Sequence, residues 1–195
     1  MLYGMKIILT ILLLLALAPP LPAQVKTQTE SDIKAKIKGF KNNKRFEVYY
    51  DKFKDQTRVA VSSFNVGGDG AYIMSGSMLG IGAYFFFEGK ELKGEIKHYI
   101  LFFNSTSREW RFLRNSQLYA LVDGERFELG EGTRRSDVRQ GGVSEQLLFK
   151  LPEDIFKKLA EAKSAELRVG PVEMTLKAEH KTAFRDLYNL AVTKD

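Results

Sequence analysis

Residues 81–103, IGAYFFFEGKELKGEIKHYILFF, decide the fold, because they hold two of the most apolar runs of the chain outside its N-terminus. The runs 81–87 and 96–103 are rich in aromatic and β-branched residues, which favour strands. The polar connection 88–95 contains Gly89 and Gly94 and is long enough for a loose turn. We therefore predict a central antiparallel hairpin. Apolar and polar residues stop alternating in the second half of each run, which indicates burial on both faces of the sheet.

A tighter hairpin is predicted on each of two glycine turns further along the chain. Asp123 and Gly124 favour a type I′ turn. The pairing that follows from this turn sets Leu118 opposite Leu129, with apolar sides together. In the second hairpin Gly170 accepts a positive φ, and the pairing that follows aligns the apolar sides of residues 165–169 and 172–176.

Two helices are predicted near the C-terminus. Residues 153–163 follow Pro152, carry acidic residues in the first turn and lysines later, and place apolar residues on one stripe. Residues 178–192 show a similar apolar stripe. Strands outnumber helices, and most neighbouring strands are joined by hairpins. The predicted fold is therefore mainly β (α+β), an antiparallel β-sandwich with two C-terminal α-helices.

The N-terminus has the layout of a secretory signal peptide, over residues 1–23. Lys6 precedes the apolar stretch 7–18, which is short for a membrane anchor and is stopped by prolines, and Ala23 offers a cleavage site. Residues 24–32 are polar and are predicted to form a flexible tether, followed by a single β-rich domain over residues 33–195. We expect an exported product, periplasmic or extracellular, with no transmembrane span in the mature protein.

Two sets of basic residues are candidates for binding. The alternation of Ile33, Ala35 and Ile37 with lysines predicts a short edge strand whose lysines form either a solvated edge or a basic docking face. Residues 108–114, if extended, set Trp110 and Phe112 on one side with two arginines, where charge and stacking could hold an anionic polymer; burial of the two aromatic rings in the core is the simpler interpretation. The candidate binding residues are Arg108, Trp110, Arg111, Arg114, Lys34, Lys36 and Lys38.

No catalytic, cofactor or metal motif is recognisable. The two histidines, His98 and His180, have no metal-ligand companion at short spacing. The position of His98 in an apolar strand predicts a hydrogen-bonded histidine in the core or at its flank, with a general base as the alternative. His180 is predicted to be solvated at the start of a helix. The chain contains no cysteine, which excludes disulfides and a thiolate nucleophile. We predict no cofactor, no metal and no specific nucleic acid partner.

The C-terminal part of the chain resembles uncharacterised secreted bacterial proteins. The similarity lies in the order of strand, short helix, hairpin and final helix over residues 151–190, and extends to residues 51–57 and Trp110. No activity is attached to that group, so the resemblance implies export and carries over no functional residue.

The sequence thus favours an exported, non-enzymatic binding or scaffold domain of the bacterial cell envelope, contacting an anionic glycan or lipid. The formal net charge of +6 agrees with an anionic partner. Two alternatives stay open. One is a secreted hydrolase whose residues converge only in three dimensions. The other is a structural subunit of an envelope assembly, joined by strand pairing along the lysine-rich edge.

Overall fold

The computed structural model describes residues 27–66, 78–139 and 142–192, and the predicted signal peptide lies outside these residues. The predicted central hairpin is confirmed as strand β4 (Met78–Glu88) paired antiparallel with β6 (His98–Ser107). Ile81 lies opposite Phe103, and Ala83 lies opposite Leu101. The connection holds one further short strand, β5 (Glu91–Lys93).

The described part of the chain is mainly β, and its sheets are antiparallel. The largest sheet has six strands in the order β2-β3-β4-β6-β10-β9, a second has four in the order β12-β11-β7-β8, and β1 pairs with β5. The remaining strands are β1 (Thr27–Thr29), β2 (Phe46–Asp51), β3 (Gln56–Asn65), β7 (Gln117–Val122), β8 (Glu125–Glu131), β9 (Thr133–Arg139), β10 (Gly142–Pro152), β11 (Ala165–Val169) and β12 (Val172–Thr175).

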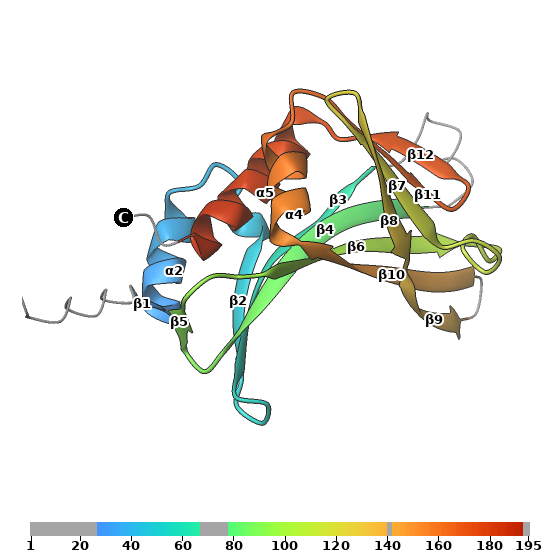
Figure 1. Ribbon diagram of the computed structural model, residues 1–195. Coiled ribbons are helices and arrows are strands. Elements are labelled where there is room, and N and C mark those ends of the chain that lie inside the picture. Colours follow the sequence, from blue (N-terminus) through green and yellow to red (C-terminus); the bar gives the residue numbers. More distant parts are fainter. Residues whose placement is uncertain (1–26, 67–77, 140–141, 193–195) are drawn as a thin grey trace, which may run out of the picture.

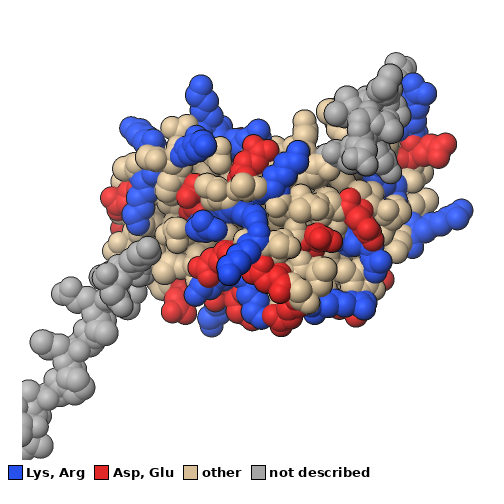
Figure 2. Space-filling model, turned by 90° about the horizontal axis from the view of Figure 1, so that it is seen from above, with Lys and Arg blue, Asp and Glu red and all other residues tan. Residues whose placement is uncertain are grey.

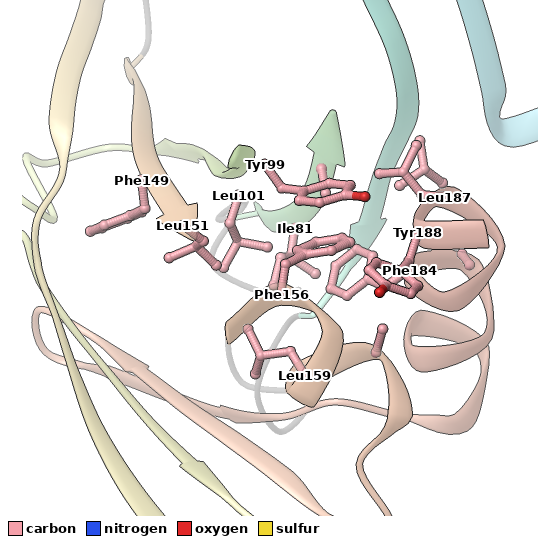
Figure 3. Close-up of a cluster of buried hydrophobic side chains, with 14 of the residues drawn as sticks. Ile81, Tyr99, Leu101, Phe149, Leu151, Phe156, Leu159, Phe184, Leu187 and Tyr188 are labelled. Atoms are coloured by element: carbon pink, nitrogen blue, oxygen red, sulfur yellow. The ribbon is translucent and has the colours of Figure 1, made fainter. Parts of the chain in front are cut away.

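Helices cover part of one face of the six-stranded sheet. In Figure 1 the sheet curves below α4 (Glu153–Glu161) and α5 (Ala178–Ala191), and the four-stranded sheet lies above its other end. Both helices were predicted from their apolar stripes, and α4 ends two residues earlier than expected. Phe156 of α4 and Phe184 of α5 are fully buried and lie 5.6 Å apart, in a core shared by both larger sheets (Figure 3).

The outer face of the central strands is buried only in part, at Phe102 but not at Phe86, so the expectation of burial on both faces is correct for only part of their length. Ile81 and Phe85 on the inner face are fully buried, whereas Phe86 is 39% exposed and Tyr84 is half-buried. The aromatic run fits because Tyr84 contacts Phe86 and Phe102 along the outer face, with ring centroids 5.0 and 5.9 Å apart. Aromatic side chains on both faces hide the alternation that marks a strand with one exposed face.

Close packing of β4 against β6 depends on Gly82. A Cβ atom at this position would come within 2.3 Å of Phe102 Cζ and 2.7 Å of the Val61 carbonyl oxygen. Gly82→Ala should therefore lower the free energy of unfolding by about 1–3 kcal/mol in urea titrations, because the ring or the strand must shift. Gly39→Ala is the control, since its Cβ would meet only the Lys36 carbonyl oxygen at 3.4 Å. Equal stability of the two variants would contradict this packing.

The two glycine-turn hairpins have the predicted pairing, with one local correction. Both Asp123 and Gly124 have positive φ, as the first turn requires, and Gly170 has φ of 53° in the second. Leu118 pairs with Gly130 and not with Leu129, because a β-bulge shifts the register between Leu118 and Tyr119. In the second hairpin the predicted pairs form throughout: Val169 with Val172, Arg168 with Glu173 and Leu167 with Met174.

The N-terminal prediction is wrong in its secondary structure. Residues 27–32, expected within a flexible tether, form β1 and the start of helix α2 (Glu30–Lys38). Thr29 caps this helix, since its hydroxyl accepts a hydrogen bond from the Asp32 N–H and its own N–H donates to the Asp32 carboxyl group. The hydrogen bonds that the Thr29 hydroxyl and the Thr29 N–H donate to the Asp32 carboxyl group lower the pKa of Asp32. Ile33 and Ile37 are four residues apart and are both buried, which fits one face of a helix as well as one face of a strand.

In the part of the chain that the structure describes, no helix combines the length and the hydropathy needed to cross a bilayer.

Candidate functional site

The segment 108–116 is a bent connection between β6 and β7, so the extended conformation on which the one-sided arrangement of residues 108–114 depended is not present. Trp110 and Phe112 consequently point into different surroundings. Trp110 is 40% exposed, whereas Phe112 is only 1% exposed and belongs to the core. The simpler interpretation of the two rings as core residues therefore holds for Phe112, and Trp110 stays available at the surface.

The buried carboxyl group of Glu145 holds this connection in place. Its side chain on β10 has no exposed surface. One oxygen accepts the Arg111 N–H at 2.7 Å, and the other accepts the Phe112 N–H at 3.1 Å. Two hydrogen bonds to one charged acceptor fix the backbone between Trp110 and Leu113. Nothing in the pattern around Glu145 indicates this role, because its partners lie more than thirty residues away.

An arginine from β9 completes the site. The guanidinium of Arg134 lies 5.4 Å from the centre of the Trp110 ring, and one of its nitrogens lies 4.0 Å from the Glu145 carboxyl group. Leu113, on the same loop as Trp110, is 53% exposed. Arg108 and Arg114 are exposed, Arg111 is half-buried, and Glu109 is the acidic residue of the same loop. We call the following six residues the arginine–tryptophan surface: Arg108, Trp110, Arg111, Leu113, Arg114 and Arg134.

The predicted lysine face does not join this surface. Lys34, Lys36 and Lys38 are exposed on helix α2, not on an edge strand. Lys34 forms an ion pair with Glu30, and Lys36 donates a hydrogen bond to Gln28. Helix α2 lies at one end of the molecule and β9 at the other (Figure 1). The four predicted residues of the 108–114 segment lie on one loop, and the three lysines lie apart from that loop on α2.

Charge of both signs is spread over the face that bears the helices. Figure 2 shows acidic and basic side chains interspersed there, with neither sign forming a continuous patch. A basic docking face is therefore not supported on that side, and the arginine–tryptophan surface is the stronger candidate.

The structure excludes a core position for His98 and a solvated position for His180. His98 is exposed at the start of β6. His180 is fully buried, packs against Phe64 with ring centroids 5.0 Å apart, and accepts the Lys177 N–H through Nδ1 at 3.1 Å. Its ring therefore serves as the helix cap that the sequence does not otherwise provide. Burial lowers the pKa of His180.

Stability should fall with acidification because of His180. Below the unfolded-state pKa of about 6.5 the unfolded chain binds a proton that the folded ring resists, so the free energy of unfolding decreases from about pH 7 downward toward the lowered pKa. Urea unfolding at about pH 7.5 and about pH 5 should show a smaller loss for His180→Gln than for the unchanged protein. His98→Gln is the control and should retain the full loss. The opposite ranking would contradict the assignment.

Among the described residues, no group of three or more acidic or histidine side chains is placed to hold a metal ion. Comparison of the chain with family models, with curated proteins and with solved structures gives no match in any of the three. The function must therefore be argued from the site itself.

Proposed function

We propose that the protein is an exported, non-enzymatic binding domain of the bacterial cell envelope that docks on anionic lipid surfaces through the arginine–tryptophan surface. The observation that carries the proposal is the Glu145 clamp, the two hydrogen bonds by which Glu145 fixes the loop that bears the exposed side chains of Trp110 and Leu113. A tryptophan ring is favoured at the level of lipid headgroups, and arginine stems can lie along apolar surface while their charged ends reach phosphate.

An exposed leucine favours lipid over glycan as the partner. The side chain of Leu113 gains nothing from a hydrated sugar polymer, whereas at a bilayer surface it can enter the apolar region. Anionic headgroups attract each nearby arginine by about 1 kcal/mol. Binding should therefore have a salt-sensitive contribution from the arginines and a salt-insensitive contribution from Leu113.

Co-sedimentation with vesicles tests this proposal. We expect binding to vesicles that contain phosphatidylglycerol, weakening as salt rises, and much weaker binding to pure phosphatidylcholine. Arg114→Gln should weaken binding about fivefold, as the loss of about 1 kcal/mol requires. Leu113→Ser should weaken it at all salt concentrations. Lys38→Gln removes the same charge at the other end of the molecule and should have little effect.

Two results would overturn the lipid assignment. If Lys38→Gln weakens binding as much as Arg114→Gln, the attraction reflects net charge and not this surface. If heparin binds as tightly as the vesicles and Leu113→Ser changes nothing, the partner is an anionic polymer.

The export part of the proposal rests on the N-terminal layout. Cleavage after Ala23 would leave the folded segment that begins at Thr27 intact. Fractionation of bacterial cells that express the full chain should recover a product outside the cytoplasm whose N-terminus lies near Gln24. An unprocessed product in the cytoplasm would contradict export.

The finer architecture belongs to the same proposal. We interpret the six- and four-stranded sheets, which share one hydrophobic core with α4 and α5, as the layers of a sandwich-like single domain. The alternative of strand pairing along the lysine-rich edge loses its basis, because that edge is a helix.

A further inference from the structure

A cleft of about 390 Å³ opens where the start of β6, the start of α4 and the end of α5 meet. Its volume falls at the lower end of the range of about 300–1,000 Å³ that is usual for small-molecule sites. Ile96 and Val192 give it an apolar part, and the hydroxyl-bearing rings of Tyr99 and Tyr188 line it together with several carboxyl groups.

The hydroxyl group of Tyr99 is buried and has no hydrogen-bond partner within the described residues. Its ring is fixed, since it stacks on Phe156 (Figure 3) with ring centroids 4.1 Å apart and only 6° between the planes. It also meets Phe85 edge-on, with ring centroids 5.7 Å apart. Burial raises the pKa of Tyr99, so the hydroxyl keeps its proton. Leaving a buried donor unpaired is costly, and Tyr99 is one of the residues that line the cleft.

Carboxyl groups dominate the charge of the cleft. Glu153 accepts a hydrogen bond of 2.5 Å from the Tyr188 hydroxyl, and both Glu95 and Asp154 also line the space. Burial and the bond to Glu153 raise the pKa of Tyr188. The basic groups are fewer: Lys97 lines the cleft, and Lys157 lies 5.8 Å from the centre of the Tyr188 ring.

We propose that this cleft binds a small hydroxylated amine, such as an amino sugar. The ammonium group of the ligand donates to Glu153 beside Glu95 and Asp154, and a ligand oxygen accepts the Tyr99 hydroxyl proton. The carbon skeleton lies against the apolar part of the cleft. Both halves of the recognition are needed, because a simple amine leaves Tyr99 unpaired and a neutral sugar leaves the carboxyl groups uncompensated. The site is independent of the arginine–tryptophan surface.

Three probes of similar shape test the charge requirement. Titrations of the purified protein followed by calorimetry should rank glucosamine first, glucose at least tenfold weaker, and glucuronate weakest because its carboxylate is repelled. Glucose binding as tightly as glucosamine would overturn the proposal, and so would a preference for glucuronate.

Tyr99→Phe separates a binding role from a structural one. Because the hydroxyl has no partner in the free protein, its removal should leave the urea midpoint unchanged or higher, while glucosamine binding weakens about tenfold. Glu153→Gln should weaken it more, and Glu91→Gln, a half-exposed carboxyl group on β5, should not change it. Unchanged glucosamine binding in Tyr99→Phe, or a lowered urea midpoint, would overturn the proposal.

Discussion

Glu145→Ala should lower the free energy of unfolding by about 3–5 kcal/mol, because it leaves the N–H groups of Arg111 and Phe112 without their acceptor. The same variant should lose vesicle binding, since the loop that presents Trp110 is released. Urea unfolding and co-sedimentation measure the two effects. Glu145→Gln keeps an oxygen that can accept one of the bonds and should fall between the unchanged protein and Glu145→Ala.

A control separates the clamp from the charge of the carboxyl group. Glu47→Ala removes the same group from β2, where the side chain is 64% exposed, and should change stability by no more than about 0.5 kcal/mol. Vesicle binding that persists unchanged in Glu145→Ala would show that the clamp is not needed to present the loop.

Phe156→Ala should lower the free energy of unfolding by about 3–5 kcal/mol, because it opens a cavity between β6 and α5. Phe156 has no exposed surface, stacks on Tyr99 and lies 5.6 Å from Phe184. Thermal and urea unfolding measure the loss. Phe53→Ala is the matched control, since the ring of Phe53 is 89% exposed and its removal should be almost neutral.

Phe156→Leu tests whether the loss comes from cavity volume. Leucine refills much of the space, so this variant should lose clearly less than Phe156→Ala. Equal losses would indicate that the flat contact with Tyr99, and not the filled volume, dominates at this position.

Local patterns sufficed where the deciding residues are close in sequence. The pairing of β4 with β6, the hairpin at Gly170 and the apolar stripes of α4 and α5 all follow from short-range signals. The bulge near Leu118 was not predicted, because one extra residue in β8 leaves no clear mark in the alternation of apolar and polar residues.

Helix α2 shows how a short window misleads. Ile33 and Ile37 satisfy a period of two and also a spacing of four, so periodicity alone could not separate strand from helix. The deciding signal lay just upstream, where Thr29 and Asp32 have the spacing of a capping box. The interpretation of residues 24–32 as a flexible tether did not take Thr29 and Asp32 into account.

The geometry of the candidate sites could not be predicted from short stretches of sequence, for a different reason. The loop 108–116 is shaped by Glu145 from another strand, and the cleft joins Tyr99 to Glu153 and Tyr188 from three separate elements. Such contacts depend on the tertiary fold. The residue types in the sequence indicate Trp110 and the neighbouring arginines as candidates. They do not indicate which of these side chains are exposed, or that Glu145 fixes their loop.

The contact between β1 and α5, the first and last elements that the structure describes, bears on when the fold can form. Gln28 in β1 is only 4% exposed, and its side-chain amide donates to the Leu190 carbonyl oxygen at 2.7 Å. This contact spans 162 positions, so the bond between β1 and α5 cannot form until the last helix has been synthesised, although β1 also pairs with β5. Closure of so long a segment is slow compared with local helix formation. A nascent chain therefore cannot complete the contact between β1 and α5 before α5 has been synthesised.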